Sequence, residues 1–79
     1  MQREKKEKLV ITFQTTTAAM AAEALFTDEK GRLIPIPREI SGGCGLAWCA
    51  DPSLENILVS LMAENDIAYQ AMKKILMYE

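Results

Sequence analysis

The segment Ile34-Pro35-Ile36-Pro37 constrains the fold of this 79-residue chain more than any other. Its β-branched residues predict a strand over residues 32–37. Proline has no backbone N–H to donate to a neighbouring strand, and two prolines two residues apart leave both missing donors on one side. We therefore expect this strand to lie at the edge of a sheet, with Ile34 and Ile36 paired to the inner neighbour.

The rest of the chain predicts three more strands and two helices. β-branched and aromatic residues indicate strands over 8–13 and 46–50, and a last strand within 67–77 whose candidate start is 67–70. Alanine-rich residues 18–26 predict a helix. Asp51 as N-cap and Pro52 at the first helical position predict a second helix, with an apolar stripe that ends before Asn65.

The order β-α-β-β-α-β most simply predicts an α+β fold, the ferredoxin-like sandwich. In it two helices cover one face of a four-stranded antiparallel sheet. Strand order 4-1-3-2 would place the proline-rich second strand at an edge. The other face is not obviously polar, because alternate residues of the first strand must lie on it, either Val10 with Thr12 or Leu9 with Ile11 and Phe13. An apolar uncovered face predicts a homodimer through the sheet.

Charge is distributed unevenly along the chain. Residues 1–8 carry a net charge of +2, whereas residues 9–72 carry three basic and eight acidic residues, a net charge of -5. We expect residues 1–7 to be a charged flexible leader, more often solvated than bound to phosphate or membrane, and residues 8–79 to be one ferredoxin-like domain. The total charge of -2 gives no reason to expect nucleic acid as a partner.

Targeting signals are absent from the sequence pattern. The charged start is followed by too short an apolar run for a secretory signal, and no run reaches the roughly 18 residues of a membrane span. We therefore expect no membrane partner and a cytoplasmic location, where the two cysteines stay reduced.

The chain has no histidine, which excludes Ser-His-Asp and Cys-His nucleophile pairs, histidine metal sites and imidazole acid–base chemistry. No carboxylate pair or phosphate-binding glycine motif replaces them. We expect no metal and no cofactor, and a carrier or binding protein rather than a self-contained enzyme. Sulfur is the best candidate to carry any chemistry.

Cys44 lies between Gly43 and Gly45 in the stretch Pro-Arg-Glu-Ile-Ser-Gly-Gly-Cys-Gly. The glycines leave the sulfur unshielded, and they permit positive φ angles that turn backbone amides toward an anion. Arg38 adds a permanent positive charge. An ordinary hairpin turn with a small buried cysteine is the alternative interpretation.

The predicted topology places this loop beside the start of the first helix, at Thr16 and Thr17. The N-terminus of a helix stabilises an anion. Arginine, loop amides and a helix end are therefore three features that would stabilise a thiolate at Cys44.

Cys49 follows Cys44 by five residues. In a strand this odd spacing puts the two sulfurs on opposite faces, about 16 Å apart at about 3.3 Å per residue. They could then neither bond nor share a metal. Cys49 is predicted to be structural.

Two runs resemble a small bacterial family of unknown function described as selenium/sulfur (Se/S) carrier proteins. They are Val-Ile-Thr-Phe with the following Thr-Thr and Ala-Met-Ala-Ala-Glu, and Arg-Leu-Ile-Pro-Ile-Pro-Arg-Glu-Ile-Ser-Gly-Gly-Cys-Gly-Leu-Ala. The resemblance spans residues 8–72. Four residues match the more specific motif: Arg38, Ser41, Cys44 and Gly45.

The resemblance implies that Cys44 is a carrier thiol that holds a persulfide or a selenosulfide. It also implies two partners, a cysteine desulfurase-like donor and an acceptor protein. The residues expected to stabilise the anion are Arg38, Ser41, Gly43, Gly45, Thr16 and Thr17. The alternative is a non-catalytic, dimeric regulatory or small-ligand-binding module.

Overall fold

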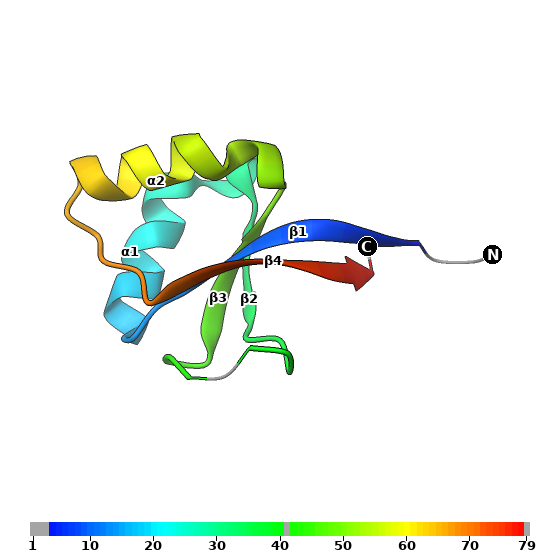
Figure 1. The fold of residues 1–79 in the computed structure, drawn as a ribbon. Coiled ribbons are helices and arrows are strands. Elements are labelled where there is room, and N and C mark those ends of the chain that lie inside the picture. The colour runs from blue at the N-terminus through cyan, green and yellow to red at the C-terminus, as the bar shows by residue number, and fades with distance from the viewer. Residues whose placement is uncertain (1–3, 41, 79) are drawn as a thin grey trace.

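The computed structural model describes residues 4–40 and 42–78. Its elements are β1 (Lys5–Thr12), α1 (Thr16–Phe26), the 3-10 helix η1 (Asp28–Lys30), β2 (Arg32–Pro35), β3 (Leu46–Ala50), the 3-10 helix η2 (Pro52–Leu54), α2 (Glu55–Glu64) and β4 (Ala71–Tyr78) (Figure 1). The predicted α+β fold, with one antiparallel sheet and two helices, is confirmed. No helix in this part of the chain is long and apolar enough to cross a membrane.

The four strands lie in the order β2-β3-β1-β4, which reads β4-β1-β3-β2 when counted from the β4 edge. Strand β2, which ends in Pro35 and is followed by Pro37, is therefore at an edge, as predicted. Ile34 pairs with Ala47 of β3. Beyond the strand, the Ile36 N–H donates to the Gly45 carbonyl at 2.9 Å. The inward pairing of both isoleucines is confirmed.

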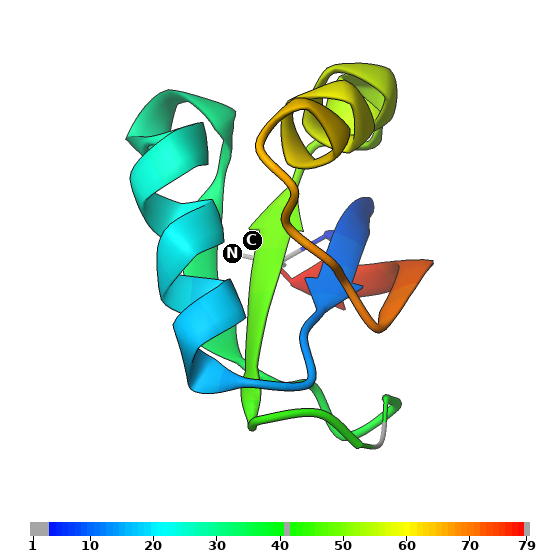
Figure 2. The ribbon, with the colours of Figure 1, turned by 90° about the vertical axis from the view of Figure 1, so that its left-hand side faces the viewer.

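One face of the sheet is covered by both helices (Figure 2). The centre of this core is Trp48 of β3, which is fully buried. Its indole N–H donates to the Lys30 carbonyl at 3.0 Å, and its ring lies 5.2 Å from that of Phe26. Other buried members of this core are Leu9, Ile11, Phe13, Ala19, Ala22, Ala50, Leu58 and Met62.

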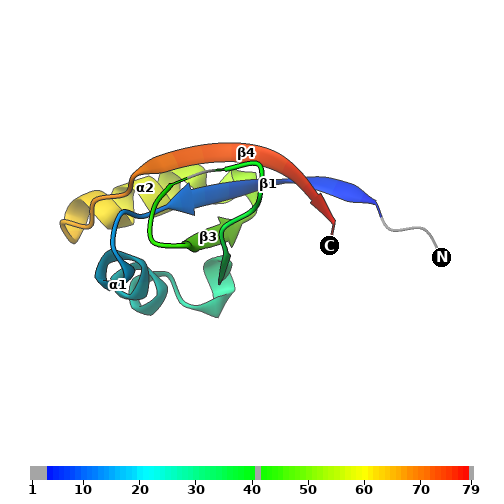
Figure 3. The ribbon, with the colours of Figure 1, turned by 90° about the horizontal axis from the view of Figure 1, so that it is seen from below.

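The opposite face carries a second, smaller apolar cluster built on Val10, Ala47 and Ile40. Val10 and not Leu9 therefore faces away from the helices. Ile40 is only 5% exposed although it belongs to the loop between β2 and β3. Figure 3 shows this loop passing across β1 toward β4. No sequence pattern predicted that the loop would cover part of this face.

The expected leader is partly a strand, because β1 begins at Lys5 rather than at residue 8. Lys5 pairs with Tyr78 and Glu7 pairs with Leu76, so β4 supplies the ladder for these residues. Pairing of the backbone with β4 does not require the charged side chains of these residues to be buried. Residues 1–3 lie outside the described part of the chain.

Three other boundaries differ from the expectation. α1 begins at Thr16 instead of residue 18, because the Thr15 hydroxyl accepts the Ala18 N–H at 3.1 Å and caps the helix. β2 ends at Pro35 instead of residue 37. The candidate start of the last strand at residues 67–70 is wrong, since β4 begins at Ala71, opposite Thr12.

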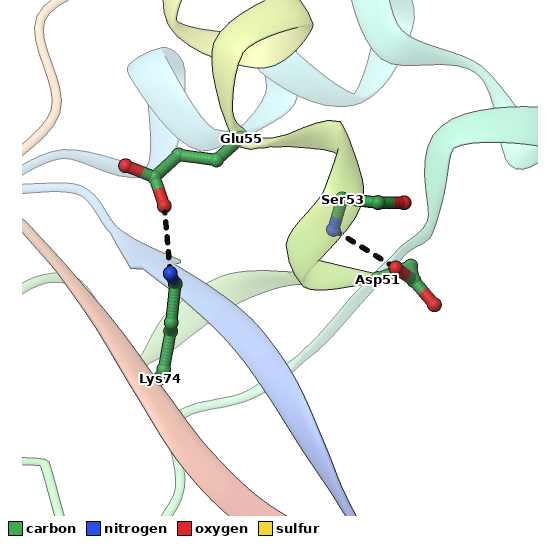
Figure 4. Close-up of polar contacts among 4 residues, drawn as sticks. All are labelled: Asp51, Ser53, Glu55 and Lys74. Carbon is green, nitrogen blue, oxygen red and sulfur yellow. Dashed lines mark hydrogen bonds and ion pairs between the residues drawn. The ribbon is translucent and has the colours of Figure 1, made fainter.

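The predicted start of the second helix is confirmed, with a 3-10 first turn. The Asp51 carboxylate accepts the Ser53 N–H at 2.9 Å (Figure 4), and Pro52 follows directly. Hydrogen bonding from Ser53, first from its side chain and then from its backbone N–H, lowers the pKa of the Asp51 carboxyl, and the charges of Lys8 and Lys6 add to this shift. The helix ends at Glu64 with Asn65 as its C-cap, in agreement with the predicted end at Asn65-Asp66, and Asp66 follows with a φ of 56°.

Candidate functional site

The loop between β2 and β3 depends on glycine at three positions. Gly42, Gly43 and Gly45 have φ angles of 92°, 76° and 90°, in the region that favours glycine. The expectation of positive φ in this loop is confirmed. These angles reverse the chain after Ile40 and bring Cys44 back to the start of β3.

The glycines that flank Cys44 differ in their surroundings. A Cβ on Gly43 would lie 2.7 Å from the Phe13 carbonyl oxygen and 2.8 Å from the Gln70 amide oxygen. A Cβ on Gly45 would meet nothing within 4 Å. Gly43 therefore allows the loop to lie close to the end of β1, whereas Gly45 leaves space on its side of the cysteine.

Cys44 is half-buried and is not in a disulfide. Its backbone N–H donates to the Phe13 carbonyl at 2.9 Å, so this amide is already used within the fold. Its sulfur packs against the helix-side core and makes a weak 3.9 Å hydrogen bond to the Leu46 carbonyl. Cys44 is therefore held in place while part of the residue stays exposed.

The start of α1 lies beside this loop, as the topology predicted. Phe13, which accepts the Cys44 N–H, precedes the N-cap Thr15 by two residues. Thr16 and Thr17 form the exposed first turn of α1. The first amides of a helix have no partner within the helix, so they are a source of positive potential at this end of the molecule.

Arg38 is not held against the Cys44 sulfur by any contact within the described residues. Arg38 is exposed, and no hydrogen bond or ion pair joins it to another residue within 4–40 or 42–78. Ser41 lies outside the described residues.

A groove of about 430 Å³ lies beside the start of α1. One wall is Gln14, Thr15 and the first turns of α1, and the other is residues 65–69, which link α2 to β4. The link also reaches the cysteine loop, because Gln70 lies next to Gly43. The sequence pattern missed this wall, since it assigned residues 67–70 to a strand. The only signal for it was the polar helix end at Asn65-Asp66.

Cys49 lies on the opposite face of the sheet from Cys44, as predicted. It pairs with Val10 and with Arg32, so it shares the uncovered face with them. It is 8% exposed. Burial raises the pKa of its thiol, and the charges of Lys8 and Arg32 oppose that shift. Cys49 is not in a disulfide either.

Comparison with known proteins gives one match, to a family of sequences. The sequence model of the family described as "Putative Se/S carrier protein-like" matches residues 8–74. These residues include both helices, the cysteine loop and most of the sheet. The same comparisons find no similar protein among curated sequences and none among solved structures. The chain belongs to the Se/S carrier protein-like family.

Proposed function

We propose that the protein carries sulfur or selenium as a persulfide or selenosulfide on Cys44. The observation that carries this proposal is the placement of one partly exposed cysteine in the glycine loop. Cys44 is joined through its own amide to Phe13, two residues before the α1 cap, and Gly45 leaves open space beside it. A thiol so placed is fixed in position yet open to the active site of another protein.

The transfer balances without an external oxidant. The Cys44 thiolate attacks the terminal sulfur of a donor persulfide, so a new S–S bond forms on Cys44. The S–S bond of the donor breaks at the same time, and the donor cysteine leaves as a thiolate. An acceptor thiolate then attacks the terminal sulfur on Cys44 and releases the Cys44 thiolate. A donor that carries selenium follows the same steps.

The surrounding residues have distinct proposed roles. The first amides of α1, at Thr16 and Thr17, stabilise the sulfur anion electrostatically. Arg38 supplies charge to the partner complex, and Ser41 belongs to the same loop motif. Gly43 keeps the loop against β1, and Gly45 admits the active site of the partner.

The groove of about 430 Å³ beside α1 supports a second candidate, a module that binds a small ligand or peptide. In that function Cys44 would be a structural residue of the loop. The two functions differ in whether an atom is added covalently to the cysteine, which a mass measurement detects.

The test is transfer from a cysteine desulfurase. The reduced protein is incubated with a catalytic amount of the enzyme and L-cysteine, and its intact mass is measured after removal of small thiols. We expect the wild type and Cys49→Ala to gain the mass of one sulfur atom, and Cys44→Ser to gain none. No gain in the wild type, or an equal gain in Cys44→Ser, would overturn the proposal.

A further inference from the structure

The groove beside the start of α1 lies on the same side of the sheet as the Cys44 sulfur. Cys44 packs against the helix-side core, and so do Ala18 and Ile67, two residues that line the groove. Figure 2 faces this end of the molecule, with α1 on one side and the link from α2 to β4 on the other. An occupant of the groove would therefore lie on the side of the sheet where the sulfur lies.

Both walls of the groove run into the Cys44 loop. One wall begins directly after Phe13, whose carbonyl accepts the Cys44 N–H at 2.9 Å. The other wall, residues 65–69, is followed by Gln70, whose amide oxygen lies 2.8 Å from the position of a Cβ on Gly43. A chain that lies along the groove therefore leads to the loop of the candidate site.

The lining of the groove combines apolar surface with polar groups that have no partner. Gln14 and Thr17 line it, and their side chains form no hydrogen bond within residues 4–40 and 42–78. The apolar part comes from both walls: Ala18, Ala21, Ile67, Ala68 and Tyr69, of which the tyrosine is 42% exposed. Such a surface suits a polypeptide segment, which has apolar side chains to bury and backbone groups that need hydrogen bonds.

Charge around the groove is negative. Residues 13–29 and 50–72, which form the helical layer, contain seven acidic residues and no basic one. Asp66 lines the groove, and it forms no ion pair within the described part of the chain, nor do Glu23 and Glu64. This charge favours a basic occupant over an acidic or neutral one.

The two ends of the groove differ in charge, which gives the occupant a direction. Asp66 lies just after the end of α2, whose last carbonyls carry partial negative charge. A basic side chain placed there would also meet the exposed ring of Tyr69. The first turn of α1, at Thr16 and Thr17, instead favours an anion. A basic residue is therefore expected toward α2, and the sulfur anion toward the Cys44 loop.

We propose that this groove binds the segment of the sulfur donor that flanks its persulfide cysteine, and that this segment is basic and partly apolar. The inference rests on the proposed carrier function, in which the transferred sulfur arrives on a cysteine side chain of another protein. That cysteine must reach Cys44, so the residues next to it lie beside the Cys44 loop, where both walls of the groove end.

The first test compares charges, by titration calorimetry of the reduced protein with the cysteine desulfurase used above. Asp66→Asn removes the carboxylate, and asparagine tolerates the φ of 56° at this position. We expect binding to weaken about twofold to fivefold, as for loss of one exposed ion pair. The matched control Glu29→Gln, beyond the other end of α1, should change the affinity by less than about 1.5-fold. The double reversal Glu64→Lys with Asp66→Lys should weaken binding by about tenfold or more.

The second test fills the groove in the same calorimetric experiment. Ala21 lines the groove, whereas Ala24 is exposed one turn further along α1 and does not line it. We expect Ala21→Phe to weaken binding about fivefold or more, because its ring takes the space of the donor segment. Ala24→Phe should bind as the wild type does.

Each contrary result is decisive. Absence of binding by the wild type, equal effects of Asp66→Asn and Glu29→Gln, or equal effects of Ala21→Phe and Ala24→Phe would overturn the docking proposal. Self-association of the wild type that Ala21→Phe abolishes, measured by sedimentation, would assign the groove to a second copy instead.

The docking proposal and the carrier function fail separately. Sulfur transfer to Cys44 with binding that none of these substitutions changes would remove only the role of the groove. Binding that follows the predicted pattern without any sulfur transfer would remove only the carrier function.

Discussion

Cys44 and Cys49 lie five residues apart and on opposite sides of one sheet, and their surroundings have little in common. Cys44 is half-buried in a glycine loop beside a helix start. Cys49 is 8% exposed in a central strand, where burial raises the pKa of its thiol. Exposure and backbone conformation, rather than residue type, therefore distinguish the candidate carrier cysteine from the structural one.

The largest effect is expected from Ile40→Ala. Ile40 is 5% exposed and anchors the Cys44 loop over Val10 and Ala47. Removal of such a buried side chain costs about 2–5 kcal/mol, and since Ile40 comes from a loop that can relax we expect about 2–3 kcal/mol. Denaturant unfolding gives this value. Hydrogen exchange should show faster opening at the Cys44 amide than at the Cys49 amide, and equal acceleration of both would contradict the anchoring role.

The next largest effect is the difference in stability between Gly43→Ala and Gly45→Ala, the substitutions on either side of Cys44. Both residues have positive φ, which costs an alanine about 1–2 kcal/mol. Only Gly43 would also press a Cβ against the Phe13 carbonyl oxygen. We expect Gly43→Ala to be the more destabilising by about 1 kcal/mol in thermal unfolding. Equal losses would show that the two flanks of Cys44 do not differ as described.

Alkylation compares the two thiols directly. In the folded protein at neutral pH we expect iodoacetamide to modify Cys44 about tenfold faster than Cys49, since Cys49 is buried and stays protonated. The single variants Cys44→Ser and Cys49→Ala assign the two rates. In denaturant the two cysteines should react at equal rates. Equal alkylation rates in the folded protein would mean that the fold does not distinguish the two cysteines.

The smallest effect is the contribution of Cys49 to the pH dependence of the free energy of unfolding. The folded-state pKa of Cys49 is raised above its ordinary value of 9.0, so its contribution to stability is present below pH 9. That contribution is lost as pH rises through the raised pKa, because the unfolded chain releases the proton first. Under reducing conditions the wild type should therefore lose more stability than Cys49→Ala between neutral pH and about pH 10. Parallel curves would contradict the raised pKa.

Features set by local chemistry were predictable from the sequence. Pro35 and Pro37 predict that β2 is an edge strand, and the Asp51-Pro52 pair predicts the start of a helix. Strand alternation predicts that the two cysteines lie on opposite faces. Each depends on residues that are close in the chain, so no knowledge of the tertiary structure is needed.

Features that depend on distant partners were not predictable. Lys5–Glu7 form a strand only because β4 runs past them, and their charges show no burial pattern. Ile40 is buried although its loop has no periodic pattern. Residues 65–69 line a groove opposite the start of α1, about fifty residues away in the chain. In each case the deciding contact is made by an element more than twenty residues away or by a loop without a regular repeat.

The central claim, that Cys44 rather than Cys49 holds the transferred atom, is tested by locating the sulfur. Trp48 separates the two cysteines, so alkylation of the desulfurase-treated wild type followed by chymotrypsin cleavage gives one peptide for each. We predict that mass spectrometry finds the added sulfur in the peptide that contains Cys44. Added sulfur in the Cys49 peptide, in both peptides equally, or in neither would contradict the account.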